Sequence, residues 1–168
     1  FGNYDVRITL PANYVVAATG ELQHDPDDPR DEKQWLRTRV DFTWQPLKEK
    51  IKTKTGAIKN VTQSFPPSAT ELKTIHFIQN NVHDFAWFAD KRFIVNYDTC
   101  IIPSGKIVEV FTFFTAPQKE TWKNCLQFTK DALRTRSEWI GPYPYKTVSV
   151  VQGPKSFGGG MEYPSITI

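Results

Sequence analysis

Cysteine is scarce in this chain, and its two occurrences argue against the protein classes that depend on it. Cys100 and Cys125 are too few for a disulfide scaffold and too far apart for a metal knuckle. One disulfide between them and two buried free thiols are both compatible with the sequence. The cysteines therefore predict neither a disulfide-rich fold nor a zinc ribbon.

Long apolar runs are also missing. No stretch approaches the roughly 20 apolar residues that a membrane-spanning helix needs, and none resembles a signal peptide. The chain begins at Phe1 without an initiator methionine. We therefore expect it to be cut from a longer protein, and its lack of a leader says nothing about that protein.

Neither sign of charge dominates. The 21 lysines and arginines nearly balance the 18 aspartates and glutamates, which gives a formal net charge of +3. Five lysines lie between residues 48 and 59, within a weakly patterned segment, 46–70, that we interpret as a surface excursion or a weak hairpin. These lysines could contact nucleic acid or another anionic surface, but no nucleic-acid motif accompanies them. The outward side of a strand or loop is the better interpretation.

Histidine is rare too, with only His24, His76 and His83 present. None belongs to an H-E-x-x-H pattern, which supplies two zinc ligands and a water-activating glutamate from one helix face. Asp84 follows His83, yet we favour structural histidines over a metal site. We therefore predict no metal ligands in this chain.

Aromatic residues, by contrast, make up 14% of the chain, and strand patterns dominate its first two-thirds. Apolar and polar residues alternate from Tyr4 to Leu10, which is the period of a half-buried strand. An apolar run at residues 14–19 predicts a second strand, and alternation at residues 36–44 predicts a long third one. Further strands are predicted at residues 73–79, 84–88 and 93–97. Short strands between turns indicate an antiparallel sandwich or saddle.

The pattern changes near residue 100. Residues 107–115 predict a strongly apolar strand, and Pro117 then opens a helix, where its missing N–H costs nothing. Apolar residues recur at helical spacing up to Ile140, and Gly141 with the following proline ends the helix. Strands are expected at residues 147–152 and 161–168, separated by a glycine-rich turn.

That turn leads into residues 157–164, Phe-Gly-Gly-Gly-Met-Glu-Tyr-Pro. By itself this segment predicts a plain hairpin turn as readily as a binding site. A nucleotide-binding glycine loop is disfavoured, because no Lys-Ser/Thr pair follows and no helix opens there.

Residues 159–162, Gly-Gly-Met-Glu, resemble the Gly-Ala-Met-Glu-Asn exopeptidase motif of the aminopeptidase N family of gluzincin zinc metallopeptidases. Two further segments agree with this resemblance and lie in the right order. Residues 139–145, Trp-Ile-Gly-Pro-Tyr-Pro-Tyr, resemble the helix-ending segment before the motif. Residues 82–90, Val-His-Asp-Phe-Ala-Trp-Phe-Ala-Asp, resemble the end of the N-terminal β domain in bacterial members. The resemblance covers nearly the whole chain and is weakest at residues 46–70.

The resemblance implies a mainly β fold with one long helix. Residues 1–97 would form an N-terminal β-saddle or sandwich, in part, and residues 98–168 the truncated start of a thermolysin-like α+β catalytic domain. The boundary is expected between residues 96 and 106. From residue 107 onward, the implied order of strand, helix, strand and motif strand is also the order that the patterns predict.

The resemblance also implies a role for each motif residue. The motif glutamate, here Glu162, would bind the free α-amino group of a peptide through a charge-assisted contact. The backbones of Gly159 and Gly160 would run along the peptide as it adds to the sheet, and glycine would allow close approach. Met161 and Tyr163 complete the substrate-binding set. Tyr163 replaces the asparagine of the family, so recognition of the substrate's end differs from the family pattern.

The zinc ligands of the family follow the motif, and neither they nor the downstream tyrosine occur in this sequence. The resemblance thus implies a part of a zinc-dependent aminopeptidase that removes N-terminal residues from peptides, with zinc in the full-length parent and no catalytic residue here. We expect the chain alone to be inactive and to self-associate through exposed apolar surface.

Two other interpretations stay open. Some relatives keep the fold, lose the zinc ligands and serve as scaffolds, and Tyr163 mildly favours this alternative. A carbohydrate-binding or adhesion sandwich would account for residues 1–97 but not for the helix and the motif strand. No nucleic-acid partner or transmembrane segment is predicted, and the compartment is left open, with a bacterial cell envelope or periplasm as one candidate.

Overall fold

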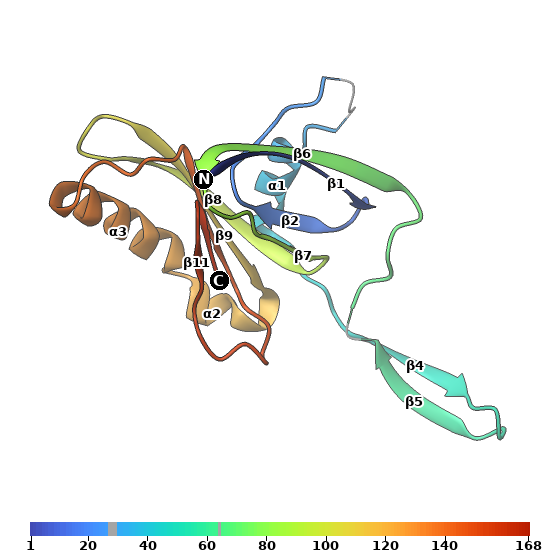
Figure 1. Cartoon of the computed structure of the whole chain (residues 1–168). Helices are drawn as coiled ribbons and strands as arrows, with labels where there is room; N and C mark the ends of the chain where they lie inside the picture. Colours follow the sequence, from blue (N-terminus) through green and yellow to red (C-terminus); the bar gives the residue numbers. More distant parts are fainter. Residues whose placement is uncertain (27–29, 64) are drawn as a thin grey trace.

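The computed structural model describes residues 1–26, 30–63 and 65–168, and the chain is mainly β, as the sequence predicts (Figure 1). Its elements, with η for 3-10 helices, are β1 (Gly2–Pro11), β2 (Val15–Ala18), β3 (Glu21–Leu22), α1 (Glu32–Arg37), η1 (Thr38–Asp41), β4 (Leu47–Lys52), β5 (Ile58–Gln63), β6 (Leu72–Val82), β7 (Trp87–Asp90), β8 (Phe93–Ile101), β9 (Ile107–Thr115), η2 (Ala116–Gln118), α2 (Lys119–Trp122), α3 (Cys125–Trp139), β10 (Thr147–Val151), β11 (Glu162–Tyr163) and β12 (Ile166–Thr167). In these ranges, no helix combines the length and the apolar character needed to cross a membrane.

An antiparallel sheet in the order β1-β6-β3 forms the outer layer. The alternation that predicted β1 is confirmed, because Ile8 is buried while its neighbours Arg7 and Thr9 are exposed. Ile8 packs with Ile75 and Phe77 of β6 against the next layer.

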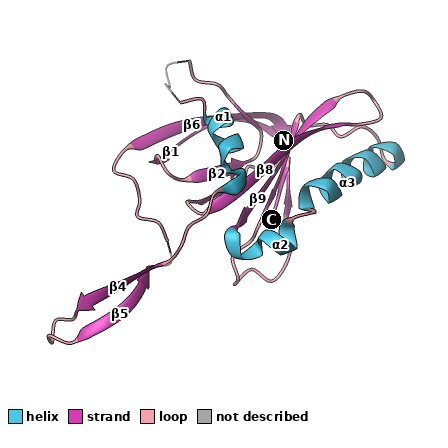
Figure 2. Cartoon of the chain, turned by 180° about the vertical axis from the view of Figure 1, so that it is seen from behind, coloured by secondary structure: helices cyan, strands magenta, loops and turns pink. Residues whose placement is uncertain are grey.

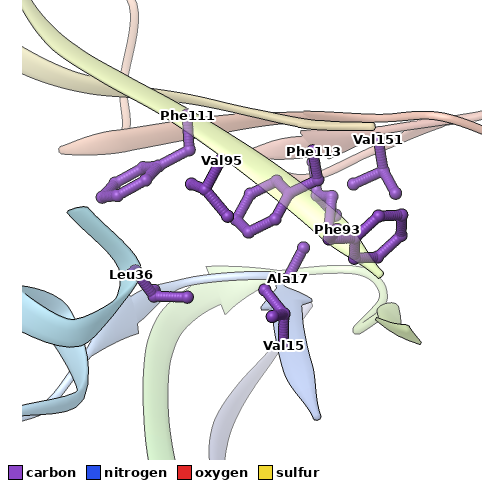
Figure 3. Packing of buried hydrophobic residues seen from close by; sticks show 9 residues of the cluster. Val15, Ala17, Leu36, Phe93, Val95, Phe111, Phe113 and Val151 are labelled. Atoms are coloured by element: carbon purple, nitrogen blue, oxygen red, sulfur yellow. The ribbon is translucent and has the colours of Figure 1, made fainter. Parts of the chain in front are cut away.

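The middle layer is the antiparallel pair β2–β7. All four residues of β2 are buried, because this strand is covered on both faces. Val16 and Ala18 face the outer sheet. Val15 and Ala17 face the third layer, where they pack against phenylalanines of β8 and β9 (Figure 3). A strand covered on both sides is apolar throughout rather than alternating, as β2 is.

The third layer is a five-stranded sheet in the order β11-β12-β10-β9-β8. β10 runs parallel to both β9 and β12, while β8 and β11 are antiparallel to their neighbours. The parallel strands β9 and β10 need a long crossover, which α2 and α3 provide. Phe111 and Phe113 of β9 face the middle layer, whereas Val108 and Val110 face Leu133 of α3. Helix α3 therefore covers one face of this sheet, and the N-terminal layers cover the other (Figure 2).

The long strand predicted at residues 36–44 is wrong. This segment contains the end of α1 and the 3-10 helix η1. Asp31 caps α1, because its carboxylate accepts a hydrogen bond of 3.0 Å from the backbone N–H of Gln34. Burial follows the helical period, since Leu36 and Arg39 are buried while Val40 is exposed. The alternation of apolar residues there did not correspond to one buried face.

Two other predicted elements are divided in the structure. The helix predicted from Pro117 consists of η2, α2 and α3 in succession. The single strand predicted at residues 161–168 is a short hairpin of β11 and β12. The division expected after residue 97 falls within β8, and it stays a prediction.

The hairpin of β4 and β5 projects from the body (Figure 1, Figure 2). Its two strands pair from Leu47↔Gln63 to Lys52↔Ile58, and their residues are almost all exposed. The weak hairpin predicted within residues 46–70 is thus confirmed. Such a hairpin adds little stability to the body, since it buries little apolar surface.

We therefore expect that replacing residues 48–62 by a short Gly-Ser linker changes the free energy of unfolding by less than about 0.5 kcal/mol. Leu47 and Gln63 are paired, so a short linker can span the gap. Urea denaturation checks this, and a loss above about 2 kcal/mol would mean that the hairpin packs onto the body.

Candidate functional site

The predicted motif strand lies at the end of the five-stranded sheet. Glu162 pairs with Thr167, and Tyr163 pairs with Ile166. Met161 and Ile168 prolong the ladder by exchanging two backbone hydrogen bonds, each of 3.1 Å. The structure thus places the motif on a hairpin whose outer strand is the last strand of the sheet.

The outer edge of β11 is open within the described part of the chain, where no strand pairs with it. In an antiparallel ladder, residues that exchange both hydrogen bonds alternate with residues whose backbone groups point away from the partner strand. Because Met161 is bonded to Ile168, the backbone N–H and C=O of Glu162 point to the open edge. An extended peptide could pair with this edge as an additional strand.

The side chain of Glu162 is exposed and lines a groove of about 570 Å³ between α3 and the strands β10, β12 and β11. Helix α3 and its end contribute Phe128 and Ile140, which are 66% and 82% exposed. Arg136 brings a positive charge to the same groove, and Thr167 lies opposite Glu162. The groove therefore combines an apolar wall with one carboxylate beside an open strand edge.

The glycines before Glu162 are exposed and leave space around the strand. A Cβ on Gly159 would meet nothing within 4 Å. A Cβ on Gly160 would lie 3.4 Å from both the Glu162 Oε1 and the Ile168 carbonyl oxygen, which is tight. Packing within this chain therefore does not require glycine at position 159, and a ligand backbone has room to approach there.

The other two predicted site residues, Tyr163 and Met161, do not both lie on the side of Glu162. Tyr163 points to the opposite face from Glu162, where it packs against the core cluster, with its ring centroid 6.4 Å from that of Phe88. Met161 is exposed beside Glu162. The structure thus brings Gly159, Gly160, Met161 and Glu162 together at the open edge, while the Tyr163 ring supports the strand from the core side.

Sequence reasoning missed the residues that anchor the hairpin. Ser165 occupies the turn between β11 and β12 with a φ of 58°. Its hydroxyl oxygen accepts a hydrogen bond of 2.8 Å from the backbone N–H of Gly20. The Thr147 hydroxyl donates to the Gly20 carbonyl at 3.1 Å. No sequence signal marked these residues, because the bond between Gly20 and Ser165 joins positions 145 residues apart.

The histidines and cysteines do not gather into a metal site. Within residues 1–26, 30–63 and 65–168, no three His, Cys, Asp or Glu side chains lie together in a way that could hold a metal ion. The His76 Nε2 lies 2.8 Å from an Asp5 carboxylate oxygen. Cys100 and Cys125 are free thiols, so of the two alternatives the disulfide is not formed. Burial raises the pKa of the Cys125 thiol, which keeps it protonated at neutral pH.

Comparison with known proteins gives matches to solved structures. No family model and no curated protein matches the sequence. Among solved structures, the chain is similar to a mutant M1 zinc metallopeptidase from Deinococcus radiodurans bound to a Tyr-Ser-Ala substrate, with a TM-score of 0.55 and 18% identity. The M1 zinc metallopeptidase without that mutation gives a TM-score of 0.54 at 17% identity. In both cases the match covers 99% of this chain and 29% of the other chain. At this identity the likeness shows a shared fold.

Proposed function

We propose that this chain is part of a zinc-dependent aminopeptidase and supplies the strand that binds the free N-terminus of a peptide. The observation that carries the proposal is the position of the Glu162 carboxylate, which is exposed beside the open edge of the terminal strand. The fold shared with M1 zinc metallopeptidases, one of them bound to a tripeptide substrate, supports it.

In the proposed complex, the peptide adds to the sheet beside β11. The backbone N–H and C=O of Glu162 pair with the peptide backbone, and the missing side chain of Gly159 lets the two strands come close. The Glu162 carboxylate accepts charge-assisted hydrogen bonds from the peptide's ammonium group. A peptide with a blocked N-terminus lacks that charge, so this contact selects for aminopeptidase substrates.

The residues of this chain do not fit a zinc ion. The described residues contain no group of three suitable ligands, and the sequence has no H-E-x-x-H pattern. In the proposal, zinc is held by other parts of the full-length protein. Residues 98–168 would then begin a thermolysin-like catalytic domain after the β domain of residues 1–97. The chain alone would be inactive, and its exposed Phe128 and Ile140 would favour self-association.

The proposal is tested on the full-length protein with a Glu162→Gln variant. Glutamine keeps the shape of the side chain and removes its charge. Because a hydrogen bond to a charged group contributes about 1.5–3 kcal/mol, we expect kcat/KM for amino-acid arylamides to fall about 10- to 150-fold. A zinc chelator should abolish hydrolysis by the unmodified protein.

The matched control is Glu120→Gln, which removes a carboxylate that is 88% exposed and lies on α2, outside the groove. It should leave kcat/KM unchanged. If the full-length protein binds no zinc and cleaves no arylamide, the aminopeptidase proposal fails. A non-catalytic scaffold is then the better interpretation, and Glu162 is an ordinary strand carboxylate.

A further inference from the structure

We propose that Ser165 is a positioning residue, whose hydroxyl ties the peptide-binding hairpin to the middle β layer and thereby fixes the position of Glu162. This inference rests on the proposed function, because it concerns how the binding strand is held. The Ser165 hydroxyl bond can also be tested without measuring catalysis.

Ser165 is bonded on two sides and is 3% exposed. Its hydroxyl oxygen accepts from the Gly20 N–H at 2.8 Å, and its carbonyl oxygen accepts from the Ser149 N–H at 2.9 Å. The first bond leads to the turn between β2 and β3, and the second leads to β10. Ser165 therefore connects the hairpin both to the N-terminal layers and to the body of its own sheet.

The hairpin needs such an anchor because its own ladder is short. β11 and β12 have two residues each, and within the described residues β11 has a neighbour on one side only. Ser165 is three positions from Glu162, in the turn that sets the register of the two strands. A small shift of this turn would therefore move the Glu162 carboxylate relative to a bound peptide.

The backbone of Ser165 indicates that the turn is held by its surroundings. Its φ of 58° lies in the left-handed region, which is costly for a residue other than glycine and persists where the surrounding structure determines it. The hydroxyl bond to Gly20 and the carbonyl bond from Ser149 are the contacts that hold it.

Gly20 offers a rigid point of attachment. Its φ is +93°, and its Cα lies so close to β6 that an added Cβ would be 2.6 Å from the Ile78 carbonyl oxygen. The Thr147 hydroxyl fixes the other side of Gly20 at 3.1 Å. The N-terminal layers thus fix how far the binding strand lies from the core.

The experiment compares Ser165→Ala and Ser165→Gly in the full-length protein. Both variants lose the hydroxyl, whereas glycine also removes the cost of the positive φ. Because both lose the anchor, we expect both to raise KM for arylamides with a free amino group about tenfold, with kcat changed less than twofold. The preference for free over N-acetylated substrates should fall in parallel. If Ser165→Gly behaves like the unmodified protein, only the backbone conformation matters and the inference is overturned.

Thr19→Val is the matched control. The Thr19 hydroxyl oxygen accepts a hydrogen bond of 3.1 Å from the Ala86 N–H, so this variant also deprives a backbone amide of its hydroxyl acceptor in the middle layer. The hydrogen bonds that the structure gives for Thr19 lead to Ala86 and not to the hairpin, so this variant should leave KM and the preference for free amino groups unchanged. An equal rise of KM in Thr19→Val would mean general loosening of the layer and would overturn the inference.

Amide hydrogen exchange of the full-length protein gives a second readout that does not depend on activity. Ser165→Ala should speed exchange at the amides of Gly20, Met161 and Ile168, whereas Thr19→Val should not affect the last two. Unchanged exchange at Met161 and Ile168 in Ser165→Ala would overturn the anchor. A lack of any hydrolysis by the unmodified protein would instead overturn the proposed function, so the two failures can be told apart.

Discussion

Gly20→Ala is expected to lower the free energy of unfolding by about 4 kcal/mol, a large part of the stability of an ordinary domain. Two costs combine at this position. The backbone has a φ of +93°, which an L-amino acid with a side chain rarely adopts. The new methyl group would also lie 2.6 Å from the Ile78 carbonyl oxygen and 2.9 Å from its carbonyl carbon. These are backbone atoms of β6, so no rotation of a side chain can relieve the contact.

Gly105→Ala separates the two costs. Gly105 has a similar φ of +82°, but an added Cβ would meet nothing within 4 Å. We therefore expect a loss of only about 1–2 kcal/mol, which reflects the backbone conformation alone. Urea denaturation of both variants measures the difference. If the two losses are equal, the turn at Gly20 can move away from β6, and it would be a poorer anchor for the hairpin of β11 and β12.

The sequence predicted well the strands in which burial either alternates between the two faces or extends over both faces. β1 shows alternation because one face is buried. β9 is mostly apolar, and all of its residues from Val110 to Thr115 are buried, because helices and the middle layer cover its two faces. The segment at residues 36–44 shows the limit of this reasoning. Its alternation was strand-like, but the Asp31 cap and the burial of Glu32 and Leu36, four residues apart, belong to a helix. The capping signal at Asp31 could have been recognised from the sequence.

The candidate site was predictable only in part, for a different reason. A local pattern and its family resemblance singled out Glu162 and the preceding glycines. The open edge of β11, the groove beside α3 and the direction of the Tyr163 ring, toward the core and away from Glu162, depend on how distant segments pack. The bond from Gly20 to Ser165 is of the same kind. Contacts between residues so far apart in the chain leave no periodic trace in a single sequence.

Lys73→Met is expected to lower the free energy of unfolding by about 2–3 kcal/mol, because it removes the nearest cation from the buried Glu32 carboxylate, which keeps its longer contact of 3.8 Å to Arg30. The side chains of Lys73 and Glu32 are 2% and 6% exposed, and the ammonium nitrogen lies 2.6 Å from the Glu32 Oε1. The Lys73 Nζ is also 4.1 Å from the centre of the Trp35 ring, which favours a cation. The pair joins α1 to β6, and methionine can fill the space but cannot balance the carboxylate.

The same substitution at an exposed pair is the control for Lys73→Met. Lys123 and Glu120 lie 3.3 Å apart and are 62% and 88% exposed, so Lys123→Met should cost less than about 0.5 kcal/mol. Adding Glu32→Gln to Lys73→Met removes the carboxylate that Lys73 balanced and should recover a small part of the loss, because Arg30 and Arg39 also interact with Glu32. If the double variant is no more stable than Lys73→Met, either Arg30 and Arg39 balance the carboxylate or the loss comes from packing around Trp35, and the Lys73–Glu32 ion pair does not account for it.

The pH dependence of the Lys73 contribution follows from its pKa. Burial lowers the pKa of the Lys73 ammonium below its ordinary value of 10.5, although Glu32 opposes the shift. Between the native pKa and 10.5, the unfolded chain therefore binds more protons than the native chain, and the contribution of Lys73 to the free energy of unfolding rises with pH. Burial also lowers the pKa of the Arg39 guanidinium to about 10, so part of the rise stays in both proteins. The slope should therefore be smaller in Lys73→Met than in the unmodified protein. Urea denaturation across the alkaline range would show it, and identical slopes for the two proteins would contradict the assignment to Lys73.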